Sequence, residues 1–388
     1  MRILFCLNSL GGFGGIERVT IVKANALAEI EGNNVAICYT DRGEYPNTIH
    51  PLSTKVKTYD LNTPYWGFTS VSKILKGIIP MIFRTRKALI DIIGEFKPDV
   101  IITTGSYEKY ALATISSRGK NNIRKFIKIR EYHFNSNYRR FLGSPLTHNI
   151  IASIIEFFER HILSRCYDKS YLLTRADFQI NFKGSERFDY MYNPTSFSTL
   201  DSPSYTNRHK VVLAVGRLSE QKNFEVLIRI WSKISHQAPG WKLKIIGDGN
   251  LRAKLIRLAS ECGVEESVQI PGKSYDVASE MAKASIYAMT SKYEGFPLVL
   301  LEAQSMGLPI ISFDTPYGPS EIVRHNVDGF IIDYNNHQQY QEKLLHLISD
   351  HDLRLKMSQK AVIHSKDFDI KKIVSQWMAN YETLLAEK

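Results

Sequence analysis

The sequence predicts an α/β protein of two doubly wound, Rossmann-like domains in series, and three observations carry that prediction. Short apolar runs alternate with helix-length amphipathic segments, which is the pattern of parallel sheets covered by helices. A length of 388 residues exceeds one typical domain and allows two cores. Residues 193–210 interrupt the alternation with Ser, Thr, Pro and Asn, and we expect them to be the interdomain linker.

The first half predicts a strand, a glycine-rich loop and a helix, followed by further strands. Its predicted strands are 2–7, 34–40, 98–105 and 125–131, and its first helix is 17–29. The second half repeats this plan. Its predicted strands are 211–216, 242–247, 268–272, 286–290 and 309–314, and its predicted helices are 224–237, 251–262, 276–284 and 297–305. Residues 370–388 predict a final amphipathic helix that no strand follows.

The formal net charge of +11 is concentrated in the first half. Residues 1–193 carry 27 Lys and Arg against 17 Asp and Glu, whereas 194–388 carry 23 against 22. Such a basic half is either a solvated face or attracts an anionic partner, such as nucleic acid, a phosphate-bearing substrate or an anionic lipid surface. No recognised nucleic-acid motif accompanies the charge, so we expect no nucleic acid partner.

Cysteine spacing and hydropathy indicate the compartment. The four cysteines are scattered, with neither zinc nor redox spacing, which favours a reducing environment. The apolar run at the amino terminus is too short for a secretory signal, and no stretch reaches the roughly 18 apolar residues of a spanning helix. We therefore expect a cytoplasmic protein, soluble or peripheral at the inner face of the membrane.

Two loops that follow predicted strands could bind phosphate. The first, 8–19, is glycine-rich and leads into a helix, so its backbone N–H groups can approach an anion. It does not match the dinucleotide fingerprint, because Glu17 takes the place of the third glycine; a purely structural loop remains an alternative. The second, 216–223 (GRLSEQKN), carries Arg217 and Lys222, two cations able to grip a diphosphate unless they are merely solvated.

The segment 294–311, EGFPLVLLEAQSMGLPII, places two acids around an apolar stretch. Glu294 is expected in a loop and Glu302 in the second turn of the helix that begins at Pro297. The N–H groups between them form an anion site, and a carboxylate can accept two hydrogen bonds from a vicinal diol. The alternative is a helix cap followed by a surface glutamate.

Taken together, these motifs resemble retaining glycosyltransferase family 4. The segment from Glu294 to Glu302 looks like the paired-glutamate motif of that family. Further segments that resemble it follow in the family's order: GGIERV (14–19), VGRLSEQKN (215–223), IIGDGNLRAKL (245–255) and NVDGFII (326–332). The resemblance covers essentially the whole chain and implies the GT-B architecture, two facing Rossmann-like domains with a carboxy-terminal helix that crosses back to the first. It implies that 1–193 with 370–388 binds the acceptor and that 208–369 binds the nucleotide-sugar donor.

The resemblance also implies roles for individual residues. Arg217 and Lys222 would bind the donor diphosphate, Glu302 the ribose hydroxyls and Glu294 the transferred sugar. His133 would face the donor sugar, although a packing role is the alternative, and with Glu294, Arg217 and Lys222 it forms the expected catalytic set. The remaining expected donor-binding residues are Gly14 and Gly15 in the first loop, Lys273 and Ser274 beside the base, and Gly295, Phe296, Pro297 and Leu298 at the phosphates.

Two segments qualify these expectations. TPYGPSEIV (315–323) lacks the two adjacent glycines commoner in the family, so the sequence does not indicate which sugar is accepted. DFD (367–369) spells the metal-binding motif of the other glycosyltransferase architecture, but no strand precedes it, and we expect neither a metal nor a cofactor.

The implied function is retaining transfer of a hexose or N-acetylhexosamine from a nucleoside-diphosphate sugar, UDP being favoured, to a saccharide or lipid-linked saccharide in cell-surface polysaccharide synthesis. One alternative is a nucleotide-binding oxidoreductase or epimerase. Asp41 would provide the acid that such enzymes have at the end of the second strand, but the dinucleotide fingerprint is missing. Another is a non-catalytic sugar-nucleotide-binding protein, although the expected catalytic residues are present.

Residues 70–93 could bring the first domain to an anionic membrane. Apolar residues recur at helical spacing from 74 to 83 beside several Lys and Arg, as an interfacial helix requires. Gly77 and Pro80 argue against one straight helix, so we expect a broken helix or a helix followed by a loop. The alternative is that both parts simply cover the sheet, as is expected in any case from about Arg84 onward.

Overall fold

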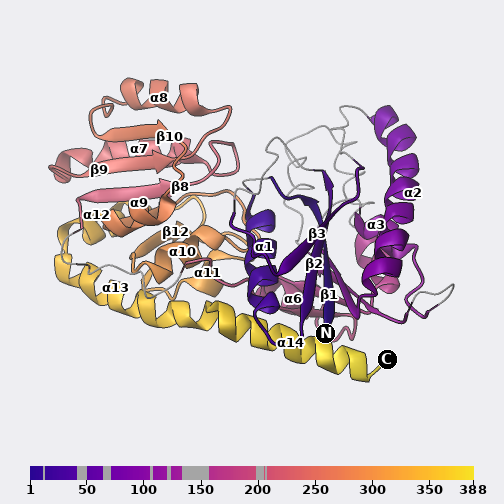
Figure 1. The fold of residues 1–388 in the computed structure, drawn as a ribbon. Coiled ribbons are helices and arrows are strands. Elements are labelled where there is room, and N and C mark those ends of the chain that lie inside the picture. The colour runs from indigo at the N-terminus through magenta and orange to yellow at the C-terminus, as the bar shows by residue number, and fades with distance from the viewer. Residues whose placement is uncertain are drawn as a thin grey trace. The chain divides into compact units, whose positions relative to one another are not determined.

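The computed structural model describes residues 1–11, 14–41, 50–63, 71–104, 108–119, 124–132, 157–197, 205 and 208–388, and for residues 41, 71–78 and 132 it describes the backbone alone (Figure 1). The chain divides into two compact units. Unit 1 comprises Met1–Pro194 with Ile370–Lys388, and unit 2 comprises Thr195–Asp369. Each unit contains a parallel sheet with helices, which confirms the predicted fold class.

Unit 1 is built on a seven-stranded sheet in the order β3-β2-β1-β4-β5-β6-β7. Its strands are β1 (Arg2–Ser9), β2 (Asn34–Asp41), β3 (Val56–Asp60), β4 (Val100–Thr103), β5 (Ile127–Tyr132), β6 (Lys169–Leu172) and β7 (Phe188–Tyr190). All neighbouring pairs are parallel. The four predicted strands are present. β3, β6 and β7 were not predicted, because they are short and mix polar with apolar residues.

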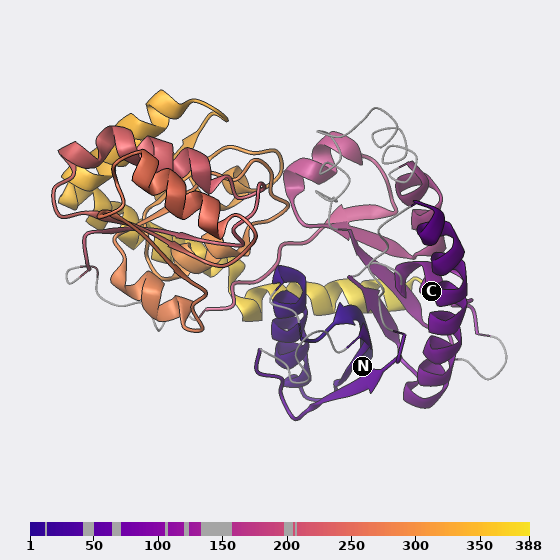
Figure 2. The same cartoon turned by 90° about the horizontal axis from the view of Figure 1, so that it is seen from above.

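Helices cover both faces of this sheet, as the two views of unit 1 show (Figures 1 and 2). Along β1 the side chains alternate. Ile3 and Phe5 belong to a core with α1 (Gly15–Ala28) and α14 (Ile370–Ala386), whereas Leu4 and Cys6 belong to a second core with α2 (Val71–Phe96) and α3 (Glu108–Ala113). Unit 1 also contains the 3₁₀ turn Leu163–Cys166 and α6 (Arg175–Asn181).

The prediction of a broken helix in 70–93 is wrong, because α2 runs continuously through Pro80. Pro80 is exposed, so the carbonyl that loses its N–H partner can be hydrated. The part of α2 beyond Arg84 packs on the sheet as expected, through Leu89, Ile92 and Ile93.

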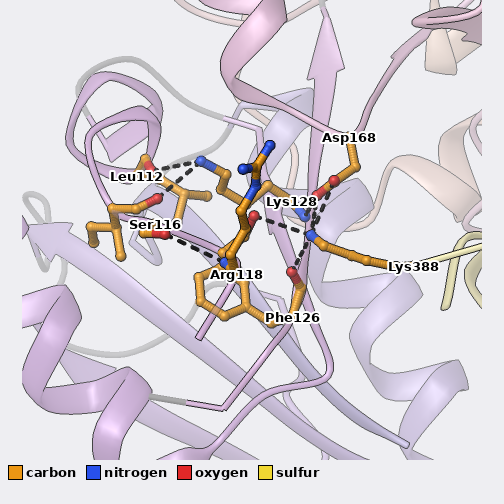
Figure 3. Close-up of polar contacts among 9 residues, drawn as sticks. Leu112, Ser116, Arg118, Phe126, Lys128, Asp168 and Lys388 are labelled. Atoms are coloured by element: carbon orange, nitrogen blue, oxygen red, sulfur yellow. Dashed lines mark hydrogen bonds and ion pairs between the residues drawn. The ribbon is translucent and has the colours of Figure 1, made fainter. Parts of the chain in front are cut away.

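Helix α14 belongs to unit 1, where its residues Trp377 and Tyr381 are buried against α1 and the sheet. The ring of Trp377 lies 4.8 Å from that of Tyr171 on β6. Beyond α14, the Lys388 ammonium donates to both carboxylate oxygens of Asp168, at 3.0 and 2.9 Å, to the Phe126 carbonyl and to Ser117 (Figure 3). Asp168 also accepts the backbone N–H of Lys128, so one carboxylate joins the end of the chain to β5.

Unit 2 contains a six-stranded parallel sheet in the order β10-β9-β8-β11-β12-β13. Its strands are β8 (Val211–Val215), β9 (Lys242–Ile246), β10 (Val268–Gly272), β11 (Ile286–Met289), β12 (Ile310–Phe313) and β13 (Gly329–Ile332). The five predicted strands are present within about one residue at each end. β13 lies in the NVDGFII segment and was not predicted as a strand.

The helices of unit 2 are α7 (Phe224–Ile234), α8 (Arg252–Glu261), α9 (Val277–Lys283), α10 (Leu298–Ser305), α11 (Pro319–Ile322), α12 (His337–Ser349) and α13 (His351–Ser365), with 3₁₀ turns at Ser235–Gln237 and Lys366–Phe368. One apolar cluster joins α7, α8 and α12 to one face of the sheet. Helix α10 packs against β12 and α13.

Within the part of the chain that the structure describes, every helix is too short or too polar to cross a membrane.

Candidate active site

The candidate site in unit 2 lies where the order of its sheet reverses. From β8 the chain moves outward through β9 to β10, and it then returns to β11 on the other side of β8 before continuing to β12 and β13. In open α/β sheets, ligands bind beyond the carboxyl ends of the strands at such a switch point. Here the loops at the switch point are 216–223 after β8 and 290–297 after β11.

Hydrogen bonds join these two loops to each other. The Thr290 hydroxyl lies 3.3 Å from the Lys222 carbonyl and 3.1 Å from the Asn223 carbonyl, and can donate to either. The Lys292 N–H donates to the Gln221 carbonyl at 2.8 Å, and the Gln221 amide donates to the Tyr293 carbonyl at 3.1 Å. The relative position of the two loops is therefore fixed by hydrogen bonds from one backbone N–H and two side chains to backbone carbonyls.

This arrangement brings Lys222 and Glu294 together. The Lys222 ammonium donates to the Glu294 carboxylate at 2.6 Å, and the two side chains are only 18% and 8% exposed. Gly216 makes room for the lysine, because a Cβ there would lie 3.1 Å from Lys222 Cε. Arg217 leaves the same loop with an exposed side chain, so this loop presents two cations.

Helix α10 begins one residue later than predicted, with Pro297 at its N-cap, and ends at Ser305 before a left-handed Gly307. The N–H of Gly307 bonds to the Gln304 carbonyl, and that of Leu308 to Ala303, which is the Schellman arrangement. Glu302 projects from the second turn, as expected, but it is only 3% exposed. It is therefore not a surface glutamate.

The carboxylate of Glu302 is held from the segment that precedes β8. The Ser196 hydroxyl donates to Glu302 Oε1 at 2.8 Å, across 106 residues of sequence. Beneath the site, the Tyr287 hydroxyl on β11 bonds to the backbone of Val215 on β8. Burial, together with the charges of Glu302 and Glu294, holds the pKa of Tyr287 well above its ordinary value, so this phenol stays neutral.

The loop 314–319 after β12 packs on the start of α10. A Cβ at Gly318 would lie 3.0 Å from Pro297 and 3.3 Å from the Gly295 carbonyl, so a larger residue would push these two segments apart. Burial raises the pKa of Asp314, at the start of this loop. The departure from the commoner family sequence in TPYGPSEIV therefore falls on backbone that touches Gly295 and Pro297.

The other predicted donor-binding residues lie outside the two loops at the switch point. Lys273 and Ser274 follow β10 at the same carboxyl edge of the sheet, where Ser274 accepts the Asp276 N–H ahead of α9. Gly14 is the N-cap of α1 in unit 1, and Gly15 is the first residue of that helix. His133 lies outside the described residues.

Within the described ranges, no three His, Cys, Asp or Glu side chains are grouped as a metal site would require. Asp367 of the DFD segment forms an ion pair with Arg324 at 2.9 Å.

Sequence reasoning missed Ser196, Gln221, Thr290, Tyr287 and Gly318. Gln221 bonds to Tyr293, and Thr290 to Asn223, each about 70 residues away in the sequence. Only the strand order makes the two loops neighbours. Ser196 was assigned to a linker, and no local pattern connects it with Glu302.

Comparisons with known proteins identify the family. A family described as "Glycosyl transferases group 1" matches residues 201–363. An uncharacterized glycosyltransferase of Haemophilus influenzae is 30% identical over 381 residues, which are 97% of this chain and 98% of that protein. The chain is a glycosyltransferase. The match to family 4 made from the motifs is confirmed.

Two further proteins are similar to this glycosyltransferase over nearly its whole length. One is a Campylobacter jejuni enzyme, 26% identical over 380 residues and 97% of each chain, named GalNAc-alpha-(1->4)-GalNAc-alpha-(1->3)-diNAcBac-PP-undecaprenol alpha-1,4-N-acetyl-D-galactosaminyltransferase. The other is the crystal structure of Anabaena HepE in complex with UDP and glucose, with a TM-score of 0.72 and 20% identity over 99% of this chain and 100% of that one. The second likeness shows the shared GT-B fold.

Proposed function

We propose that this glycosyltransferase moves a hexose or an N-acetylhexosamine, with retention of configuration, from a UDP-sugar to a saccharide or lipid-linked saccharide in cell-surface polysaccharide synthesis. The name of the Campylobacter relative, which acts on an undecaprenol-linked saccharide, supports the acceptor class. The complex of HepE with UDP and glucose supports the donor class.

One observation carries the proposal: a lysine and a glutamate that are both partly buried, 2.6 Å apart, meet at the switch point of unit 2. In this proposal Lys222 and Arg217 neutralise the departing diphosphate, Glu294 holds sugar hydroxyls and Glu302 holds the ribose diol. The backbone of 295–298 holds phosphate at the first turn of α10. Lys273 and Ser274 border the base, and the roles of Gly14, Gly15 and His133 stay predictions from the motif resemblance.

The proposed reaction is a front-face displacement. The bond from the anomeric carbon to the diphosphate breaks, and the acceptor oxygen bonds to the same face of that carbon while its proton passes to the departing phosphate. No side chain at this edge of the sheet is needed as a nucleophile. Lys222, Arg217 and the α10 terminus supply positive charge where negative charge develops, and neither a metal nor a cofactor is proposed.

Radiolabelled nucleotide sugars test this function. We expect the purified chain to hydrolyse or transfer sugar from a UDP-hexose or UDP-N-acetylhexosamine, and proton NMR of the product to show the anomeric configuration of the donor. Failure with all uridine, guanosine and adenosine diphosphate sugars, with and without lipid-linked saccharides, would contradict the proposal. Reduction of NAD by a sugar nucleotide would favour the oxidoreductase alternative.

We also propose that unit 1 meets an anionic membrane surface through α2. On the solvent side of this helix, Ile79 and Phe83 are 57% and 66% exposed and lie one turn apart, and the cationic Arg84 and Lys87 beside them are also exposed. An apolar face flanked by cations suits the interface of an anionic leaflet, where each cation contributes about 1 kcal/mol.

Liposome co-sedimentation tests this surface. Binding should require anionic lipid and fall as salt is raised, and it should weaken in Ile79→Ser/Phe83→Ser and in Lys73→Glu/Lys76→Glu. Ile363→Ser is the matched control, because Ile363 is 55% exposed on α13 of unit 2. Equal recovery with neutral and anionic vesicles would contradict this part of the proposal.

A further inference from the structure

Ser196 occupies a special place in the chain, two residues after unit 1 ends at Pro194. The backbone around it makes one long-range and one local hydrogen bond. The Thr195 N–H donates to the Phe368 carbonyl at 2.9 Å, and the Phe197 N–H bonds to the Thr195 hydroxyl at 3.3 Å. Phe368 lies just before unit 2 ends at Asp369. The two chain segments that leave unit 2 are therefore hydrogen-bonded to each other inside it.

From this fixed backbone, the Ser196 hydroxyl reaches the buried carboxylate of Glu302 at 2.8 Å. A hydrogen bond to a charged acceptor is stronger than one between neutral groups, and it restrains the rotation of the carboxylate. A carboxylate has about four acceptor positions, so a bond from Ser196 is compatible with bonds from a ligand's hydroxyls.

We propose that Ser196 is a positioning residue for Glu302, and that through this bond the nucleotide site is coupled to the segment where the chain enters unit 2. The inference rests on the proposed role of Glu302 as the ribose ligand. A carboxylate held in one rotamer loses less freedom when it accepts two hydroxyls of a rigid diol. Conversely, a bound ribose keeps Glu302 in place and so restrains the backbone of Thr195 to Phe197.

Binding of nucleotides with and without the diol separates this role from a merely structural one. We would measure the affinity of the full chain for UDP, GDP and ADP by calorimetry, and then for the 2′,3′-dideoxy form of the nucleotide bound most tightly. Ser196→Ala should weaken binding of the ribonucleotide about three- to tenfold and change binding of the dideoxy form little. Ser196→Thr, which keeps the hydroxyl, should restore the preference for the diol.

Hydrogen exchange tests the coupling. In the wild type, the ribonucleotide should slow exchange of the amides of Thr195 and Phe197, and in Ser196→Ala this protection should be lost. Ser232→Ala is the control, because the Ser232 hydroxyl is bonded to the Arg229 carbonyl on α7 and should affect neither measurement. Thermal melts of each variant monitor folding.

The outcomes distinguish the inference from the function on which it rests. If Glu302→Ala abolishes the preference for the diol but Ser196→Ala leaves it at the wild-type value, the positioning role is wrong and the ribose site stands. If Glu302→Ala keeps the preference, or if no nucleotide binds, both are wrong. The inference is supported if Ser196→Ala loses the preference for the diol, Ser196→Thr restores it, and the control Ser232→Ala keeps it.

Discussion

The two units share one plan, a parallel sheet between helices, but they place their buried charges differently. In the described part of the chain, the ion pairs whose side chains are both at most 10% exposed all lie in unit 1: Lys23–Glu131, Lys109–Glu159 and Arg130–Glu159. In unit 2, the buried carboxylate of Asp328 is bonded to Gln304 of α10 and to the ring of His364 on α13, and the pair Lys222–Glu294 lies at the loop edge. The best-buried pairs of Lys or Arg with Glu therefore join elements in unit 1, whereas the partly buried Lys–Glu pair of unit 2 lies where we propose that the donor binds.

Glu159 is the centre of the buried charge in unit 1. Its carboxylate accepts from Lys109 at 2.7 Å, from the Tyr110 hydroxyl at 2.7 Å and from Arg130 at 2.6 Å. Arg130 also donates to the Glu159 carbonyl at 3.0 Å, so α3 and β5 are joined to residue 159. A buried ion pair is not by itself stabilising, but removing one partner leaves the other buried without compensation.

The largest effect is therefore expected from Glu159→Ala. It should lower the free energy of unfolding of unit 1 by about 3–5 kcal/mol, because two buried cations lose their carboxylate. Hydrogen exchange of the full chain can show this, as amides of β5 should exchange faster while those of β8 and β11 do not change. Glu95→Ala, which removes an exposed partner of Lys57, is the control and should leave both sheets unaffected. Equal loss in both units would contradict this division of labour.

The next largest effect concerns unit 2. Lys222→Met should cut turnover about 10²- to 10³-fold, because the charge facing the departing diphosphate is lost. Lys292→Met is a matched control: Lys292 pairs with Glu220 across the same two loops at 3.3 Å, but the two side chains are 41% and 66% exposed. That pair should contribute less than about 1 kcal/mol to stability and nothing to turnover. Steady-state kinetics and a denaturation curve for both variants would decide, and equal turnover in the two would refute the special role of Lys222.

The same contrast explains what the sequence could predict. In unit 2, β8 (VVLAV) and β11 (IYAM) were found because they are apolar runs bounded by glycine or polar residues. In unit 1, β3 (VKTYD) and β6 (KSYL) carry charged or polar residues among few apolar ones, and neither gives a period-2 signal strong enough to identify it. Pro80 predicts a break in the helix, but it lies on the solvent side of α2, where a proline is tolerated. The sequence alone does not show on which side of the helix it lies.

Contacts between distant segments were beyond the sequence. The candidate loops were recognised from their own residues, but the meeting of Lys222 and Glu294 depends on β8 and β11 being neighbours. Lys109, Arg130 and Glu159 are each ordinary surface residue types, and only their convergence makes them buried. Motifs therefore predicted the residue types of the site, and topology decides which of them touch.

A smaller effect is expected at the ion pair of Asp168 with Lys388 in unit 1, because both charges are partly exposed. Asp168 holds the Lys388 ammonium and the Lys128 N–H (Figure 3). Asp168→Asn should cost unit 1 about 1–2 kcal/mol and speed exchange at the end of α14, leaving α1 protected. Lys388→Met should reproduce the effect on α14 and spare β5. Unchanged exchange in both variants would show that apolar packing alone holds this helix.

The smallest effect is the dependence on pH that Glu159 should give to the stability of unit 1. Burial alone would raise the pKa of Glu159, but the charges of Lys109 and Arg130 outweigh it and lower the pKa below its ordinary value of 4.5. Burial and the two cations shift the pKa of Glu159 in opposite directions, so the net lowering is smaller than the cations alone would cause. A carboxylate with a lowered pKa in the folded state stabilises fully above its unfolded pKa, and the contribution is lost as the pH falls through the folded value. The difference in unfolding free energy between the wild type and Glu159→Gln should thus be constant from pH 7 to about 5 and shrink below about pH 4.5. Other carboxylates are common to both proteins and cancel. Urea denaturation monitored by hydrogen exchange of the β5 amides would measure this difference in unfolding free energy. A difference that grows on acidification would show that Glu159 is not charged in the folded protein.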